Sequence, residues 1–252
     1  MTRYIDIGNS NIVIGTGNKR ITDTFRYKTD MTKSGDEYQA LLGHHIQDAT
    51  EVIIASVVPQ LNTAFKSFIA RYHGLQPLFV GPGVKTGVKI KTDNPREVGA
   101  DLVAGAAGAI AQYGDSGIVI DMGTATTVTY YEEKEIKGVA ITIGLDTSRD
   151  ALVSKASKLL QFEFETPKTL LGTNTVDALN AGLLYGHAFQ IIGLVKNISR
   201  QYSFSGPVIM TGGAAKLIKA LLPAHYIFDE HLVLEGLLAI AEKNRPATPS
   251  HD

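Results

Sequence analysis

The chain of 252 residues carries 24 Lys and Arg against 25 Asp and Glu, so its formal net charge is −1. A near-neutral charge gives no electrostatic reason to expect nucleic acid or an anionic membrane as a partner. The 44% apolar and 19% charged content are those of an ordinary globular protein, and the absence of cysteine excludes disulfides, thiolate catalysis and cysteine-ligated metals.

The length accommodates two domains better than one small core. We expect an N-terminal domain at 1–113, a C-terminal domain at 114–245 and a disordered tail at 246–252, which contains Pro, Ser and Asp. No apolar run approaches the roughly 18 residues of a membrane span. The first residues are predicted to form a strand, so we expect no secretory signal. We therefore expect a cytoplasmic protein with no membrane partner.

The first domain alternates between predicted strands and helices. Strands are expected at about 3–7, 12–16, 22–28, 52–57 and 77–80, and helices at about 34–48 and 60–73. This alternation is typical of a partly parallel sheet covered on both faces. A loop-like segment from 81 to 95 then leads to an Ala- and Gly-rich helix at about 96–113. Its small residues indicate close backbone packing, most simply between domains.

The second domain repeats this plan from about residue 115. After a second hairpin come an apolar strand at 138–144 and helices at about 146–160, 175–202 and 231–243. The helix at 175–202 is apolar and small on one side, which suits either a core or a subunit interface. It is our first candidate for a dimer contact.

Two short segments of similar design stand a domain apart. Asp6-Ile7-Gly8-Asn9-Ser10-Asn11 and Asp121-Met122-Gly123-Thr124-Ala125-Thr126 each adjoin an apolar run and lead into another strand. The pattern predicts a strand ending in an acid, a tight glycine turn and a return strand. Glycine lets the backbone approach an anion, amides and hydroxyls supply neutral donors, and the acid can hold a cation that bridges phosphates. One such turn could be a plain hairpin, but two copies indicate a duplicated phosphate-binding device.

A third segment, Gly206–Ala215, is a buried strand that runs through a glycine turn into a helix. By itself it is typical of a joint in which glycine serves packing. Together with the two turns it resembles the actin/sugar-kinase/Hsp70 superfamily. The resemblance implies two duplicated ribonuclease-H-like, actin-like ATPase domains of the α/β class. Each would be a mixed sheet flanked by helices, with a cleft between the domains that closes on ATP.

Within that superfamily the chain resembles the type III pantothenate kinase family over most of its length. The matching segments, in the family's order and spacing, are Asp6–Asn11, Ser56–Pro59, Asn94–Asp101, Asp121–Thr127, Gly172–Thr175 and Thr211–Gly213. The resemblance implies ATP-dependent phosphorylation of pantothenate to 4'-phosphopantothenate, the first step of coenzyme A biosynthesis. It also implies an obligate homodimer that needs Mg²⁺ and a monovalent cation, K⁺ or NH₄⁺.

The resemblance assigns ATP to the two turns and the third segment. Asp121 is expected to bind the monovalent cation, and Asp6 to hold Mg²⁺ through a bound water. The expected ATP- and phosphate-binding residues are Asp6, Ile7, Gly8, Asn9, Ser10, Asn11, Ile12, Val13, Gly123, Thr124, Thr126, Gly212 and Gly213.

The acceptor side centres on Asp101, the candidate general base. Phosphoryl transfer to an alcohol needs a carboxylate that accepts the hydroxyl proton, and Asp101 stands near a helix start, where the dipole favours its ionised form. It also occupies the Gly-Ala-Asp position that carries the base in the family. Thr175 matches a substrate-contacting position but is equally suited to cap the following helix. The expected substrate-binding residues are Thr92, Gly99, Ala100, Asp101, Leu102 and Thr175.

Three positions depart from the family's pattern. Leu102 stands where arginine is usual, Thr92 where tyrosine is frequent, and Ile143-Gly144 where Pro-Gly is usual. Leucine offers no donor to the pantothenate carboxylate. The residues therefore leave three functions open: a pantothenate kinase with a rearranged acceptor pocket, a kinase for another small hydroxyl compound, or a non-catalytic nucleotide-binding regulatory paralogue. Retention of all three aspartates argues against the last.

Overall fold

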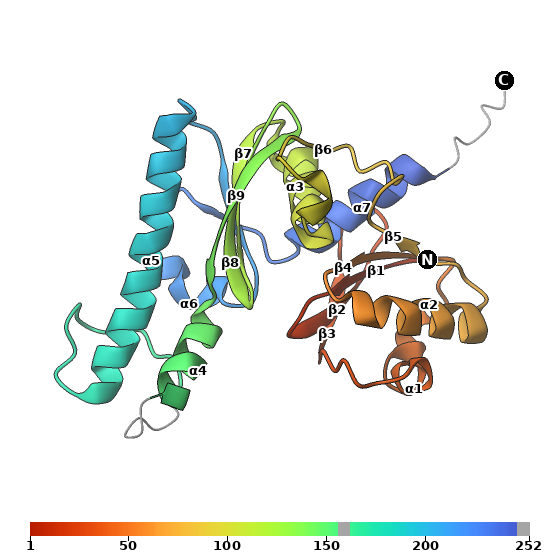
Figure 1. Ribbon diagram of the computed structural model, residues 1–252, viewed down its shortest axis with the longest axis horizontal. Helices are drawn as coiled ribbons and strands as arrows, with labels where there is room; N and C mark the ends of the chain where they lie inside the picture. The colour runs from red at the N-terminus through yellow and green to blue at the C-terminus, as the bar shows by residue number, and fades with distance from the viewer. Residues whose placement is uncertain (156–161, 246–252) are drawn as a thin grey trace. The chain divides into compact units, whose positions relative to one another are not determined.

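The structure is a computed structural model that describes residues 1–155 and 162–245 (Figure 1). The described residues form two compact units: 1–112 together with 231–245, and 113–155 together with 162–230. The expected tail at 246–252 and the end of the helix expected at 146–160 lie outside the described residues.

The first unit contains a mixed sheet in the order β3-β2-β1-β4-β5. The first three strands form an antiparallel meander, and β4 and β5 continue the sheet in parallel. The strands are β1 (Thr2–Ile7), β2 (Asn11–Thr16), β3 (Asp23–Lys28), β4 (Glu51–Ser56) and β5 (Leu78–Phe79). The remaining elements are α1 (Gly35–Ile46), α2 (Pro59–His73), β6 (Lys89–Ile90), a 3₁₀ helix (Pro95–Glu97), α3 (Ala100–Tyr113) and α7 (Leu232–Asn244).

Helices α1 and α2 form a core with one face of this sheet. Side chains alternate along a strand, so Ile5 and Ile7 of β1 point to the same face, where they join Tyr38 of α1 and Phe65 of α2. Helix α1 begins with a capping box, in which the side chains of Ser34 and Glu37 each accept a hydrogen bond from the other's amide.

Helix α7, blue in Figure 1, belongs to the first unit although the sequence analysis placed it in the C-terminal domain. It packs on β1 and β4, with Leu232 and Leu237 fully buried. The amide of Ile21 donates to Glu235 Oε1 at 2.7 Å, and Arg245 just beyond the helix pairs with Glu51 of β4. The helix joins the first unit because its apolar face covers that sheet.

The small residues of α3 allow close contact with α7. A Cβ on Gly108 would overlap the carbonyl oxygen of Leu232, and a Cβ on Gly236 would overlap that of Ala104. The close backbone approach predicted for this helix is therefore present. Its partner is a helix of the same unit and not the other domain.

The second unit repeats the strand arrangement of the first, in the order β9-β8-β7-β10-β11. Strands β7, β8 and β9 form the antiparallel meander, and β10 and β11 add in parallel. The strands are β7 (Gly117–Met122), β8 (Ala125–Glu132), β9 (Glu135–Ile143), β10 (Val208–Thr211) and β11 (Ile227–Phe228). The helices are α4 (Leu145–Lys155), α5 (Thr175–Gln201), α6 (Ala215–Ile218) and a 3₁₀ helix (Lys219–Leu221). The duplication expected from the two turns therefore extends to the topology of both sheets.

Helix α5 covers one face of the second sheet. Among the described residues it is the one helix long and apolar enough to cross a membrane by length and composition. Its Leu184, Ala188 and Ile191 are buried in one cluster with Ile120 of β7 and Met210 of β10. A helix packed in this way is a core helix of the unit.

Candidate active site

Asp6 and Asp121 occupy the same place in the two units. Each is the fifth of six residues in a central strand that has an antiparallel partner on one side and a parallel partner on the other. Both residues are half-buried, whereas the residues before them are buried. The carboxyl end of such a strand, where the sheet changes direction, is the usual ligand site of open α/β sheets.

The first turn, Gly8–Ser10, joins β1 to β2. The amide of Gly8 donates to the carbonyl of Asn11 at 2.9 Å. Thr29, directly after β3, donates its hydroxyl to the carbonyl of Gly8 at 2.6 Å and its amide to the carbonyl of Ser10 at 3.0 Å. Asn9 and Ser10 are exposed, so the turn presents polar side chains to a ligand.

Two of the expected phosphate-binding residues, in the strands beside this turn, have side chains that a ligand cannot reach. Ile7 and Ile12 are fully buried in the core of the first unit. Only their main-chain groups can approach a phosphate. Val13 is half-buried and stands opposite Asp6 in the β1–β2 register.

The second turn, Gly123-Thr124, joins β7 to β8 and is enclosed by the segment after β9. The amide of Gly123 donates to the carbonyl of Ala125 at 3.0 Å. The carbonyl of Thr124 accepts from the amide of Gly144 at 3.1 Å and from the hydroxyl of Thr147 at 2.8 Å. A Cβ on Gly144 would overlap the carbonyl oxygens of both turn residues. Sequence reasoning noted Gly144 only as half of a Pro-Gly departure and missed this packing requirement.

The glycine turn after β10 lies against Asp121. Thr211 stands opposite Asp121 in the β10–β7 register. Gly212 has a φ of 93°, and a Cβ there would lie 2.6 Å from Asp121 Oδ1. Gly213 follows it and is exposed. The structure therefore brings two of the sequence-predicted segments together within the second unit.

Thr126 does not present its side chain to a ligand, contrary to its place in the expected phosphate set. Its side chain is fully buried, and its hydroxyl lies 2.9 Å from Nε2 of His187 on α5. Burial lowers the pKa of His187, which favours the neutral ring in this bond. The Thr126 hydroxyl thus links β8 to α5, and only the main-chain groups of this residue can approach a phosphate.

Asp101 lies in the first turn of α3. Its Oδ1 accepts from the amide of Leu102 at 2.7 Å and sits where a Cβ on Gly99 would be. The same Cβ would lie 3.3 Å from Val57 Cγ1, and the amide of Val57 donates to the carbonyl of Ile7 at 3.0 Å. These contacts place the carboxylate beside Val57, which follows β4 and is hydrogen-bonded to the last residue of β1. Burial raises the pKa of Asp101, and its backbone hydrogen bonds oppose that rise.

Two further acceptor-side candidates differ in their surroundings. The Thr92 hydroxyl oxygen is buried and has no hydrogen-bond partner within the described part of the chain. Such a group costs free energy until a polar partner reaches it, so it suits a ligand contact. Ala100 and Leu102, on either side of Asp101, are both half-buried.

Thr175 is the first residue of α5 and not its cap. The cap is Asn174, whose Oδ1 accepts from the amide of Asp177 at 2.9 Å. The Thr175 side chain is therefore not needed for capping. It lines an open hollow of about 520 Å³ together with Gly172, Thr173, Asn174, Ala178 and Leu179.

The carboxylates fit the expected cations. In residues 1–155 and 162–245 no three His, Cys, Asp or Glu side chains gather as a metal site. Mg²⁺ in kinases is bound largely by waters and substrate phosphates and needs only one or two carboxylates. Asp6 and Asp121, at equivalent strand ends, supply one carboxylate each, and the space that a Cβ on Gly212 would fill adjoins Asp121.

The type III pantothenate kinase family model matches residues 4–197, which include both turns, Asp101 and Thr175. The chain belongs to this family. A curated type III pantothenate kinase from Bacillus cytotoxicus is 41% identical over 253 residues, 97% of this chain and 97% of that protein. The family expected from the sequence is confirmed. As a member of this family, the chain is a kinase that phosphorylates pantothenate in coenzyme A biosynthesis.

Solved structures share the architecture at low sequence identity. A candidate Baf family transcriptional activator from Campylobacter jejuni superposes with a TM-score of 0.64 at 18% identity, covering 96% of this chain and 98% of that one. A candidate 2-dehydro-3-deoxygalactonokinase from Sinorhizobium meliloti gives 0.60 at 15% identity, covering 98% and 100%. These likenesses confirm the expected fold of two mixed sheets flanked by helices.

Proposed function

We propose that the chain transfers the γ-phosphoryl group of ATP in line to the primary hydroxyl of pantothenate, with Asp101 as general base. The observation that carries this assignment is the setting of the Asp101 carboxylate: half-buried, in a helix first turn, and packed on Gly99. Burial raises its pKa, which makes it a stronger proton acceptor than a solvated aspartate. As the pantothenate oxygen attacks the γ-phosphorus, the bond from that phosphorus to the bridging oxygen breaks and ADP leaves. The proton of the pantothenate hydroxyl passes to a carboxylate oxygen of Asp101.

On the ATP side, the two turns would bind the phosphates through neutral donors. Asn9 and Ser10 are exposed in the first turn, and Gly123 and Thr124 form the second. The carbonyl oxygens of Gly8, Ser10 and Thr124 are held by donors of the protein, which reduces their repulsion of an anion. When bound, Mg²⁺ neutralises phosphate charge. Asp6 would hold it through a bound water, and Asp121 would bind K⁺ or NH₄⁺.

On the acceptor side, leucine at position 102 means that another group binds the pantothenate carboxylate. The amide of Leu102 is already engaged by Asp101. The buried Thr92 hydroxyl and the Thr175 hydroxyl at the hollow of the second unit are the polar groups that we assign to pantothenate.

We also propose a cytoplasmic homodimer that contacts its partner through α5. Phe189 is 54% exposed and stacks on Tyr185 of the same helix, with ring centroids 5.9 Å apart. Tyr185 is half-buried, and an exposed phenylalanine stacked on it suits a subunit contact. The cytoplasm supplies ATP and the other substrate.

ADP release from Mg·ATP tests the function directly. It is measured with and without pantothenate, first in potassium buffer and then in sodium buffer. We expect release that depends on pantothenate and is faster in potassium. Nucleotide binding without pantothenate-dependent release would overturn the proposal, and equal rates in both buffers would overturn the monovalent-cation assignment.

A further inference from the structure

Thr29, the residue after the third strand of the first unit, hydrogen-bonds to the main chain of the Gly8–Ser10 turn. Thr29 follows β3 directly and donates to two carbonyl oxygens of the Gly8–Ser10 turn. One bond comes from its hydroxyl, 2.6 Å from the Gly8 oxygen, and the other from its amide, 3.0 Å from the Ser10 oxygen.

The second unit builds the same support at the equivalent place. Gly144 follows the third strand, β9, and its amide donates to the carbonyl of Thr124 at 3.1 Å. Three residues later Thr147 donates its hydroxyl to the same oxygen at 2.8 Å. In both units, therefore, an amide directly after the third strand and a threonine hydroxyl hold carbonyls of the turn between the first two strands.

Peptide geometry gives this support a consequence for anion binding. In a trans peptide the C=O and the following N–H point in opposite directions. A hydrogen bond to the Gly8 oxygen therefore fixes the direction of the Asn9 amide, and one to the Thr124 oxygen fixes that of the Ala125 amide. The same bond keeps the electron-rich carbonyl oxygen pointed toward the threonine. A phosphate bound by the amide on the other side is then not repelled by that oxygen.

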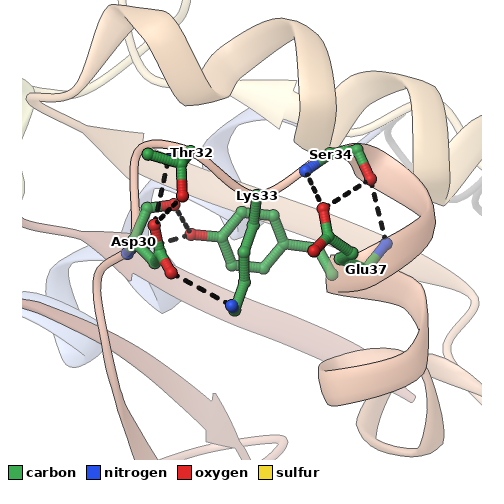
Figure 2. Close-up of polar contacts among 6 residues, drawn as sticks. Asp30, Thr32, Lys33, Ser34 and Glu37 are labelled. Atoms are coloured by element: carbon green, nitrogen blue, oxygen red, sulfur yellow. Dashed lines mark hydrogen bonds and ion pairs between the residues drawn. The ribbon is translucent and has the colours of Figure 1, made fainter.

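The segment that carries Thr29 is itself fixed. Tyr38 of α1 is fully buried, and its hydroxyl donates to the carbonyl of Asp30 at 2.7 Å. Figure 2 shows the Asp30 carboxylate accepting from Thr32 and from Lys33, whose Nζ lies 3.0 Å away. The Thr32 hydrogen bonds, with Lys33 as a smaller contributor, lower the pKa of Asp30 to about 2, so the carboxylate stays ionised at neutral pH. Thr29 thus projects from a loop tied to the helix core.

We propose that Thr29 and Thr147 are positioning residues that orient the backbone of the two phosphate turns for ATP. The proposal rests on the proposed function, because it takes the turns as the site of the ATP phosphates. Neither threonine needs to touch the nucleotide.

The test compares Thr29→Val and Thr147→Val with Thr29→Ser and Thr147→Ser. Valine keeps the branched shape and removes the hydroxyl, whereas serine restores it. We expect each valine variant to raise KM for Mg·ATP, and Kd for Mg·ADP by calorimetry, about five- to tenfold, the order of one lost hydrogen bond. KM for pantothenate should stay unchanged, and the serine variants should recover most of the nucleotide affinity.

Thr22→Val is the matched control. Thr22 lies at the opposite end of strand β2 from the Gly8–Ser10 turn, and its amide donates to the carbonyl of Thr16 at 2.8 Å. Its hydroxyl has two acceptors within reach, Asp23 Oδ2 at 2.8 Å and the Thr16 carbonyl at 3.2 Å. Thr22→Val therefore also loses a threonine hydroxyl donor, but at a distance from the phosphate turn. Its nucleotide affinity should therefore match that of the wild type.

Unchanged Mg·ADP affinity in both valine variants, with only a lowered Tm, would overturn the proposal, as would a failure of serine to restore affinity. Failure of the proposed function is seen separately, as absence of pantothenate-dependent ADP release in the wild type. Even if the wild type releases no ADP in response to pantothenate, the Mg·ADP affinities of the valine and serine variants still test the role of the two threonines. If Gly212→Ala weakens Mg·ADP binding and the valine variants do not, the nucleotide site stands and the positioning role fails.

Discussion

The two turns share one topology but are held in different ways. The Gly8–Ser10 turn is fixed mainly by hydrogen bonds, and the nearest atom to a Cβ on Gly8 would be the Asn11 oxygen at 3.2 Å. The Gly123-Thr124 turn is enclosed by Gly144 and Gly212, where a Cβ would overlap main-chain atoms. Two copies of one device can therefore differ in how well they tolerate a larger side chain while they keep the same topology.

The units also differ in what lies beside the turn. In the first unit, β4 is followed by Val57, which contacts the Gly99 position that packs against Asp101. In the second unit, β10 is followed by Gly212, which packs on Asp121. The first unit thus adds a candidate base, Asp101, to the carboxylate at its strand end, whereas the second unit packs a glycine against the carboxylate at the equivalent place.

The largest effect is expected from Asp101→Asn. Loss of the base should reduce kcat by about 10²-fold or more and leave Mg·ADP affinity largely intact. Asp36→Asn is the control, because Asp36 is also the second residue of a helix but is exposed and pairs with Arg71. Near-wild-type turnover in Asp101→Asn would show that Asp101 is not the base.

The raised pKa of Asp101 predicts two opposite pH effects. Turnover should fall on acidification at a pH above the ordinary aspartate value of 3.8, because the base is then protonated. Stability should move the other way. Between the unfolded and the raised folded pKa the native state holds a proton that the unfolded state has lost, so the free energy of unfolding decreases as pH rises. Asp101→Asn should therefore lack the acid limb and be at least as stable as the wild type in neutral-pH calorimetry.

The contrast in tolerance is tested by Gly212→Ala against Gly8→Ala. Gly212 combines a φ of 93° with close main-chain neighbours, so alanine there should weaken Mg·ATP binding about tenfold or more and lower Tm. Gly8→Ala should weaken Mg·ATP binding only a few-fold, because the neighbouring Asn11 carbonyl oxygen need move by only a few tenths of an ångström. Equal losses in steady-state KM and Tm would refute the claim that glycine packing distinguishes the second turn.

A smaller effect, confined to stability, is expected for Thr126→Val. Removing the hydroxyl leaves His187 without this bond in a buried position and should cost about 1–2 kcal/mol in denaturant unfolding. KM for Mg·ATP should not change, and Thr126→Ser should restore the stability. A clear rise in that KM would show that the Thr126 hydroxyl contributes to ATP binding.

The smallest effect is expected on the acceptor side, from Leu102→Arg. A guanidinium beside Asp101 can pair with the pantothenate carboxylate and should lower KM for pantothenate several-fold. Leu102→Lys controls for charge without the planar fork. An unchanged or raised KM would show that other groups already satisfy the carboxylate.

Sequence patterns alone predict the strands, the two turns, the positions of Asp6, Asp101 and Asp121, and the family. These features are local: a run of apolar residues ending in an acid and a glycine specifies a strand and a turn wherever it occurs. The alternation of strands and helices also sufficed for the two mixed sheets, since parallel strands need helical crossovers.

Only the tertiary structure decided which unit α7 joins, that Thr126 is buried against His187, that Asn174 caps α5, and that Thr29 and Thr147 support the turns. Each depends on contacts with residues whose position a local pattern does not specify. Thr147 and Thr124 are separated by all of β8 and β9, and α7 meets β1 across nearly the whole chain. Hydrogen bonds and apolar burial form wherever folding brings partners together, so the residues that orient this site were readable only once both sheets were assembled.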